Sequence, residues 1–230
     1  MKVFPHDSLQ EVYWIEKPDG KKMLATKNLA PGIRVYGEEL IKIEGIEYRI
    51  WDPYRSKLAA AILKEMDVSM IKPGAKILYL GASTGTTASH VSDIVGARGK
   101  VFAIEVSARV MREFTERVAS HRSNVYPILA DARHAENYSD VVGTVDVVYC
   151  DVAQPDETEI AMENCYQMLK KSGLLCLAIK ARSIDATKEP EEIFERERKK
   201  LAEGGFKILD IKHLYPFDKD HAMVISILRK

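Results

Sequence analysis

Short apolar runs alternate with stretches of helical periodicity through the last two thirds of the chain. Runs of four to eight apolar residues predict buried strands, whereas apolar residues three and four positions apart predict amphipathic helices. The predicted strands are 77–80, 101–105, 124–130, 145–150, 173–179, 206–213 and 221–228, and the predicted helices are a segment around 88–95 and residues 108–120, 157–171 and 189–203. Repeated strand–helix units predict an α/β fold with a mainly parallel seven-stranded sheet between two helical layers. No helix separates the last two strands, so the final strand can run antiparallel.

The N-terminal residues follow a different pattern, in which apolar and polar positions alternate. Turn signals at Lys17–Gly20 and at Glu44-Gly45 each lie between two such segments. An alternating segment, a turn and a second alternating segment predict a β-hairpin. We therefore expect a small β-rich N-terminal domain over residues 1–55 and a larger α/β domain over residues 56–230.

A helical pattern begins after Ser56, with apolar residues at Leu58, Ala59 and Ile62. Serine is a favourable helix N-cap, and this cap places Lys57 in the first turn. A cation is unfavourable there because the helix dipole prefers anions at that end. The misplaced charge indicates a functional role for Lys57, although a solvated lysine explains it equally well. The charged segment 189–203 is predicted to be a solvated helix face.

Charge and composition narrow the classes of function. The chain has 230 residues with 34 Lys and Arg against 34 Asp and Glu, so its formal net charge is zero. A balanced charge gives no general electrostatic attraction to nucleic acid, although it allows a local basic patch. Hydrophobic residues make up 46% of the chain, which is typical of a globular protein with a packed core.

Cysteine usage and the N-terminus indicate an intracellular protein. Cys150, Cys165 and Cys176 are odd in number and lack metal-ligand spacing, so we expect free buried thiols in a reducing compartment and no metal site. The first ten residues, MKVFPHDSLQ, contain no signal-peptide core, and no apolar run approaches the roughly 18 residues of a membrane span. We expect a soluble protein with no membrane partner.

The loop between the first strand and helix of the larger domain predicts a nucleotide site. Gly81-Ala82-Ser83-Thr84-Gly85-Thr86-Thr87 follows an apolar run and precedes a helix. Glycines allow a ligand to approach the backbone, and free N–H groups at a helix start face it. Ser83 stands where a dinucleotide fingerprint requires glycine, which favours S-adenosylmethionine, a ligand without a pyrophosphate. Glu105, at the end of the next strand, can accept hydrogen bonds from ribose hydroxyls. The alternative is an ordinary α/β turn with a helix-capping acid.

Polar residues at the ends of the other parallel strands are expected to meet at the same edge, because ligands bind there in such sheets. Asp131 would accept the adenine amino group, while Asp151 and Lys180 would lie beyond the cofactor near the transferred methyl. The predicted cofactor-binding residues are Gly81, Ala82, Ser83, Gly85, Thr86, Thr87, Glu105, Val106, Asp131, Ala132, Asp151 and Gln154. A lysine oriented by an aspartate in a partly dry pocket is suited to take a proton from a hydroxyl.

Two other chemistries fit the strand ending at Cys150 less well. Enzymes that methylate exocyclic amines carry an Asn/Asp-Pro-Pro-aromatic signature after this strand, and Ala153 in Asp-Val-Ala-Gln-Pro breaks that pattern. A cysteine nucleophile is also disfavoured, because Cys150 points to the opposite side of the strand from Asp151.

Five segments together resemble the fibrillarin family in its archaeal form. They are WDPYRSKLAAAI, KILYLGASTGTT, YCDVAQPD, LAIKARSID and DKDHAMVI, and the likeness extends over essentially the whole chain. It implies a Rossmann-like class I methyltransferase fold and transfer of a methyl group from S-adenosylmethionine to a ribose 2′-hydroxyl of rRNA and tRNA. Related ribose methyltransferases carry a Lys-Asp-Lys-Glu tetrad, to which Lys57, Asp151 and Lys180 correspond. His221 stands at the fourth position, as in fibrillarins.

The resemblance also implies partners: a box C/D guide RNA, a Nop-family scaffold protein and a kink-turn-binding ribosomal-type protein. The chain lacks the glycine/arginine-rich tail of eukaryotic fibrillarins, which suggests the cytoplasm of an archaeal cell. Two alternatives stay open: a small-molecule or protein O-methyltransferase on the same fold, and a non-catalytic assembly subunit that binds the cofactor for stability.

Overall fold

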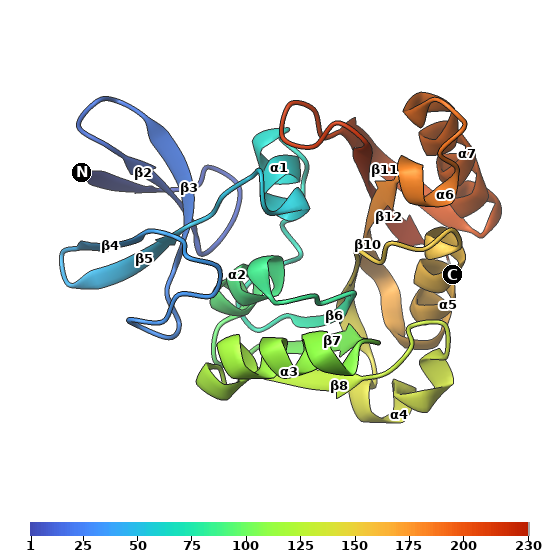
Figure 1. Cartoon of the computed structure of the whole chain (residues 1–230), viewed down its shortest axis with the longest axis horizontal. Helices are drawn as coiled ribbons and strands as arrows, with labels where there is room; N and C mark the ends of the chain where they lie inside the picture. Colours follow the sequence, from blue (N-terminus) through green and yellow to red (C-terminus); the bar gives the residue numbers. More distant parts are fainter. Residues whose placement is uncertain (230) are drawn as a thin grey trace.

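The first 50 residues form an antiparallel sheet with the strand order β1-β2-β3-β5-β4, at the left of Figure 1. The computed structural model describes residues 1–229. The strands are β1 (Lys2–Pro5), β2 (Val12–Glu16), β3 (Lys22–Lys27), β4 (Leu40–Ile43) and β5 (Ile46–Ile50). Both predicted hairpins are present. In the second, Glu44 and Gly45 have φ values of 50° and 84°, and positive φ at both loop residues matches the twist of a two-residue hairpin.

A second, seven-stranded sheet has the order β11-β12-β10-β9-β6-β7-β8. Its strands are β6 (Lys76–Leu80), β7 (Lys100–Glu105), β8 (Val125–Leu129), β9 (Val145–Cys150), β10 (Leu169–Lys180), β11 (Phe206–His213) and β12 (His221–Leu228). The neighbours from β10 to β8 run parallel, whereas β12 is antiparallel to both β10 and β11. The predicted mainly parallel sheet with an antiparallel last strand is therefore confirmed. The connection between β11 and β12 is too short for a parallel crossover.

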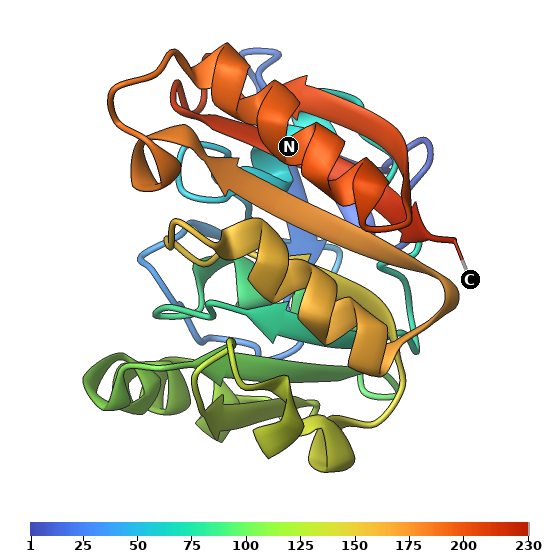
Figure 2. The same cartoon turned by 90° about the vertical axis from the view of Figure 1, so that its right-hand side faces the viewer.

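Helices cover both faces of this sheet (Figures 1 and 2). The helices are α1 (Lys57–Leu63), α2 (Thr86–Val95), α3 (Ala108–Arg117), α4 (Ser139–Val142), α5 (Glu157–Met168), α6 (Ala181–Ile184) and α7 (Pro190–Glu203). The first three pack with residues of one sheet face into one core, and α4 to α7 pack into a second core on the other face. Short 3₁₀ turns at Ala119–His121 and Ala135–Asn137 complete the connections.

Four elements differ from the predictions. The helix expected over 157–171 ends at Met168, because Leu169 already pairs with Val145 of β9 as part of β10. The helix expected over 108–120 ends at Arg117 and continues as a 3₁₀ turn. β1 was not predicted: it is an edge strand with mostly exposed residues and gives no alternating apolar signal. The helix over 190–203 is also more than a solvated face, since it buries Ile193 and Leu201 against the sheet.

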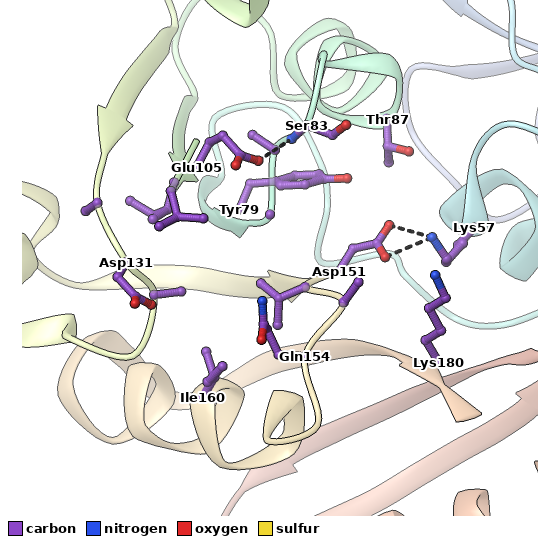
Figure 3. Close-up of a pocket in the computed structure, with 18 of the residues that line it drawn as sticks. Lys57, Tyr79, Ser83, Thr87, Glu105, Asp131, Asp151, Gln154, Ile160 and Lys180 are labelled. Atoms are coloured by element: carbon purple, nitrogen blue, oxygen red, sulfur yellow. Dashed lines mark hydrogen bonds and ion pairs between the residues drawn. The ribbon is translucent and has the colours of Figure 1, made fainter. Parts of the chain in front are cut away.

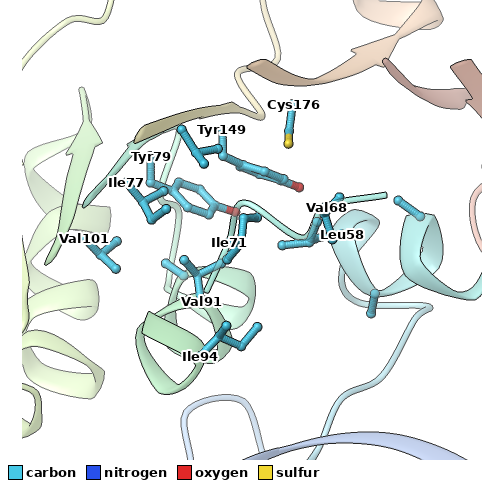
Figure 4. Packing of buried hydrophobic residues seen from close by; sticks show 14 of the residues in the cluster. Leu58, Val68, Ile71, Ile77, Tyr79, Val91, Ile94, Val101, Tyr149 and Cys176 are labelled. Atoms are coloured by element: carbon cyan, nitrogen blue, oxygen red, sulfur yellow. The ribbon is translucent and has the colours of Figure 1, made fainter. Parts of the chain in front are cut away.

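The core between β6, β9 and the helices α1 and α2 contains two tyrosines whose rings pack at a tilted angle (Figure 4). The rings of Tyr79 and Tyr149 lie with centroids 4.6 Å apart and are almost completely buried. Cys176 lies in the same core, and all three cysteines of the chain are buried thiols, as predicted. Burial raises the pKa of the Cys150 thiol well above its ordinary value, so the cysteine closest to the site is held as an inert thiol.

A buried network of charged groups joins the N-terminal sheet to helix α2. Asp93 of α2 accepts hydrogen bonds from Arg49 Nη1 of β5 at 2.7 Å and from Arg122 Nη1 at 2.6 Å. Arg49 Nη2 also donates to Glu38 Oε1 at 2.6 Å, and the Thr26 hydroxyl donates to Asp93 at 2.8 Å. The side chains of Arg49, Asp93 and Arg122 have no exposed surface. A buried charge is tolerated only when it is paired and hydrogen-bonded, so the network fixes how the two sheets meet.

Candidate active site

A cavity of about 430 Å³ opens at the carboxyl ends of β6, β7, β9 and β10 (Figure 3). The residues that line it are Arg55, Lys57, Tyr79, Gly81, Ala82, Ser83, Thr86, Thr87, Ile104, Glu105, Val106, Ala130, Asp131, Ala132, Arg133, Asp151, Val152, Ala153, Gln154, Ile160 and Lys180. The polar residues at the ends of the parallel strands therefore lie together around one cavity, as predicted. Of the predicted site residues, only Gly85 and His221 do not line this cavity.

The loop after β6 is shaped by two glycines with different roles. The N–H groups of Gly81 and Ala82 both donate to the Ile104 carbonyl at 3.0 Å, which ties the loop to β7. A Cβ on Gly81 would lie 2.5 Å from the Asp151 carbonyl oxygen, so glycine lets this loop pass against the end of β9. Gly85 has a φ of 96°, and a Cβ there would lie 2.4 Å from a Val118 methyl group. Gly85 therefore allows close packing on α3, and its predicted contact with a ligand stays a prediction.

Glu105 is held at one end of the cavity by the backbone. Its Oε2 accepts from the Ser83 N–H at 3.1 Å, and its Oε1 accepts from the Ser107 N–H at 2.9 Å. A carboxylate has about four lone-pair positions, so two remain for ligand hydroxyls. The loop N–H that Glu105 binds belongs to the serine that replaces a fingerprint glycine, which links the two predicted features directly.

The loops after β8 and β9 form the floor of the same end. Asp131 Oδ1 accepts from the Arg133 N–H at 3.0 Å. The Arg133 guanidinium donates to Gln154 Oε1 at 2.9 Å and to Asp156 at 2.8 and 2.9 Å. Arg133 thus joins the two loops that carry the predicted Asp131 and Gln154. It was not predicted, although it follows the strand-end aspartate by two positions, and the strand-end rule could have included it.

The opposite end of the cavity carries the charged residues from α1, β9 and β10. Lys57 Nζ lies 2.9 Å from Asp151 Oδ1 and 3.1 Å from Oδ2, and each side chain is 23% exposed. The ammonium group of Lys180 points toward this pair in Figure 3. Within residues 1–229, the structure shows no ion pair for Lys180. We expected Asp151 to orient Lys180; instead, the aspartate is engaged by Lys57.

The start of α1 positions Lys57. Ser56 caps the helix, as predicted, by accepting from the Ala59 N–H at 3.3 Å. The Ser56 hydroxyl also lies 2.9 Å from the Thr87 hydroxyl in the first turn of α2. This contact joins the N-termini of α1 and α2, so Lys57 and the glycine loop are held in one arrangement. The first turn of α1 contains no acid, and Asp151 supplies the negative charge near Lys57.

His221 lies beside Lys180 on the neighbouring antiparallel strand. It is the cross-strand partner of Lys180 in the β10–β12 pair, and paired residues project from the same face of a sheet. Its Nδ1 lies 2.6 Å from Asp218 Oδ1, and its side chain is 9% exposed. Burial raises the pKa of Asp218, but the hydrogen bond and charge of His221 outweigh it, so the pKa lies below its ordinary value. Asp218 was missed because it is in a loop, three residues before the histidine.

The chain is similar to known proteins in sequence and in fold. The family model described as Fibrillarin matches residues 3–230. A relative from Sulfurisphaera tokodaii, a fibrillarin-like rRNA/tRNA 2′-O-methyltransferase, is 55% identical over 94% of this chain and 93% of its own. The solved Aeropyrum pernix fibrillarin with natively bound S-adenosyl-L-methionine superposes with a TM-score of 0.92 at 49% identity, covering 99% of this chain and 98% of its own.

A solved fibrillarin/Nop5p complex is also similar. Its matching chain has a TM-score of 0.85 at 38% identity, covering 96% of this chain and 99% of that chain. Within residues 1–229, no helix is both long and apolar enough to span a bilayer. The seven-stranded sheet, the strand-end cavity and these likenesses together identify the fold as that of the S-adenosylmethionine-dependent methyltransferases. The chain belongs to the fibrillarin family.

Proposed function

We propose that this protein transfers a methyl group from S-adenosylmethionine to a ribose 2′-hydroxyl of RNA, as the catalytic subunit of a box C/D guide ribonucleoprotein acting on pre-rRNA and tRNA. The observation that carries the proposal is the cavity with two chemically different ends (Figure 3). One end offers Glu105 and Asp131 to a nucleoside, and the other gathers Lys57, Asp151 and Lys180 where a hydroxyl would react. The fibrillarin-like relatives are named as rRNA/tRNA 2′-O-methyltransferases.

The donors and acceptors of the cavity fit the cofactor. Glu105 has lone pairs free for two ribose hydroxyls, and Asp131 can accept from an adenine amino group. Apolar side chains of Val106, Ala132 and Ile160 line the same end and can contact the faces of an adenine ring. Thr86 and Thr87 line the cavity, and as the first residues of α2 their N–H groups have no partner within the helix. When bound, S-adenosylmethionine supplies a sulfonium methyl as the electrophile.

The charged end of the cavity would activate the hydroxyl. Lys180 would lie next to the 2′-oxygen and stabilise the negative charge that develops as this oxygen bonds to the methyl carbon. The carbon–sulfur bond of the cofactor would break in the same step, and the hydroxyl proton would pass to water. Asp151 would hold Lys57 Nζ in place, and the pair would add a fixed dipole at the same point. His221, oriented by Asp218, would present Nε2 to the substrate. Alignment of the hydroxyl with the cofactor should supply much of the rate enhancement.

Substrate selection would come from partners. With zero net charge, the chain should have little non-specific affinity for RNA, because phosphate neutralisation supplies most of that affinity. The fibrillarin/Nop5p complex supports a Nop-family scaffold as one partner. We extend the proposal to a guide RNA that selects the nucleotide by base pairing and to a kink-turn-binding ribosomal-type protein. The archaeal relatives support a place in the cytoplasm of an archaeal cell.

The test is reconstitution with labelled S-adenosylmethionine. The protein is combined with a scaffold protein, a kink-turn-binding protein, a guide RNA and a complementary target, and each component is omitted in turn. We expect label on one ribose 2′-oxygen of the target, lost when the guide is replaced by one with a mismatched sequence. Label on a small molecule or a protein would favour the other O-methyltransferase classes. Cofactor binding without any transfer would favour an assembly subunit, and efficient single-site transfer by the isolated protein would contradict the role of the partners.

A further inference from the structure

Glu157, the first residue of α5, is a buried acid beside the candidate site. Its side chain has no exposed surface, and its Oε1 accepts from the Lys180 backbone N–H at 2.8 Å. Its Oε2 is buried and has no hydrogen-bond partner among the described residues. Asp151 and Glu157 therefore flank one loop, the aspartate beside Lys57 and the glutamate below the backbone of Lys180.

The contact replaces a missing strand partner. The pairing of β10 with β9 ends at Leu177 opposite Cys150, because β9 ends at Cys150 whereas β10 continues to Lys180. On its other side, β10 stays paired with β12 as far as Lys180. A buried backbone N–H without a partner is costly, and the Glu157 carboxyl supplies the acceptor that β9 no longer offers. The last residue of β10 is thus held by a side chain on one side and by a strand on the other.

The charges around Glu157 favour its neutral form. Burial raises its pKa, and the Lys180 N–H lowers it. The carboxylates of Asp151, just after β9, and of Glu197 on α7 raise the pKa, and Lys57 on α1 lowers it. Together these effects bring the pKa of Glu157 to about 9. At neutral pH the group is therefore a carboxylic acid whose carbonyl oxygen accepts the Lys180 N–H. Asp151, on the other side of the loop, is paired with Lys57.

We propose that Glu157 is a positioning residue for Lys180: its carboxyl group accepts the Lys180 N–H and fixes the end of β10 so that the lysine reaches into the cavity. The inference rests on the proposed function, because it concerns the residue that meets the 2′-oxygen there. A positioned ammonium stabilises developing charge only if its backbone is fixed before the reaction. A carboxylate at the same point would instead weaken the positive field of Lys180.

The test compares Glu157→Gln, Glu157→Ala and the exposed control Glu163→Gln on the same helix, each in the reconstituted particle. Single-turnover methyl transfer is measured with saturating cofactor and RNA, together with cofactor affinity and thermal unfolding. Glu157→Ala should be about tenfold slower, the factor that corresponds to one lost hydrogen bond of about 1.4 kcal/mol. Glu157→Gln keeps a neutral acceptor, so it and the control should match the unsubstituted protein at pH 7. All should bind the cofactor equally.

A pH series separates positioning from a purely structural role. Above pH 9 Glu157 ionises in the unsubstituted protein but glutamine does not, so the rate of Glu157→Gln relative to the unsubstituted protein should rise between about pH 7 and 9.5. A constant ratio, a folded Glu157→Ala with full activity, or a Glu157→Gln as slow as the alanine variant would each overturn the inference. If Glu157→Ala does not fold, the inference is tested by the rate of Glu157→Gln at pH 7 and by the pH dependence of that rate relative to the unsubstituted protein. Inactivity of the unsubstituted particle would instead count against the proposed function.

Discussion

Replacing Gly81 by alanine should damage both stability and the reactive end of the cavity. Gly81 has a φ of 80°, and the added Cβ would lie 2.5 Å from the Asp151 carbonyl oxygen and 2.9 Å from its carbonyl carbon. A left-handed conformation costs a non-glycine residue about 1–2 kcal/mol. Overpacking against backbone that cannot rotate away adds about 1–3 kcal/mol. We therefore expect Gly81→Ala to lower the free energy of unfolding by about 2–5 kcal/mol.

Gly74→Ala is a matched control that separates the cost of the left-handed conformation from the cost of the close contact. Gly74 has nearly the same φ, 83°, but a Cβ added there would meet nothing within 4 Å, and this glycine precedes β6 at the far end of the strand. Gly74→Ala should lose only the conformational term, about 1–2 kcal/mol, and keep full methyl transfer. Gly81→Ala should lose more stability and also transfer slowly, because relief of the overlap displaces the backbone of Asp151.

The free energy of unfolding of both variants is measured by denaturant unfolding, with the dependence on denaturant concentration fitted for each variant. Methyl transfer is then measured in the reconstituted particle under conditions in which both variants are folded. Equal losses of stability in the two variants would show that the chain around Asp151 adjusts to the extra methyl group. Full activity of Gly81→Ala would show that the position of Asp151 does not depend on this contact. Either result would refute the reasoning from close approach.

The remaining predictions concern single side chains. Asp151→Ala or Lys180→Ala should abolish methyl transfer while the thermal unfolding curve and cofactor binding are kept; near-normal turnover in both would refute the site assignment. Glu105→Ala should weaken cofactor binding by about 1.5–3 kcal/mol, because two ligand hydroxyls lose a charged acceptor, and unchanged affinity in calorimetry would contradict this role. Asp93→Asn should destabilise the fold by about 3–5 kcal/mol in denaturant unfolding, since it leaves the buried Arg122 without a counter-charge and Arg49 with Glu38 alone; a loss below about 1 kcal/mol would mean that water replaces the carboxylate.

Local patterns in the sequence were sufficient for most of the fold. Hairpins at 12–27 and 40–50 and the buried strands depend on nearby residues: turn types, alternation and short apolar runs. The strand-end rule also gathered Glu105, Asp131 and Lys180 in one cavity, because parallel strands carry their carboxyl ends to one edge. The division of the chain at residue 55 stays a prediction, as do the roles of the individual site residues.

Contacts between distant segments could not be predicted. The pairing of Asp151 with Lys57 depends on how α1 packs against the sheet, 94 positions away in sequence. Gly85 belongs to a ligand-binding motif, yet its hydrogen faces α3, which only the packing reveals. Glu157 reads as a helix-start acid that should be solvated, and its burial follows from where β9 ends. In each of these three cases the sequence shows which chemical group is present, but only the folded structure shows which residues it contacts.

The buried network around Asp93 has a consequence for how this chain can change over time. Arg49 comes from the N-terminal sheet, and Asp93 from the helix that begins at the glycine loop. Loss or exchange of the N-terminal sheet would remove Arg49 and leave Asp93 with Arg122 in a surface newly opened to water. The two parts are therefore expected to be inherited together. A chimera with an N-terminal sheet from a different protein would need a matching arginine before it could fold.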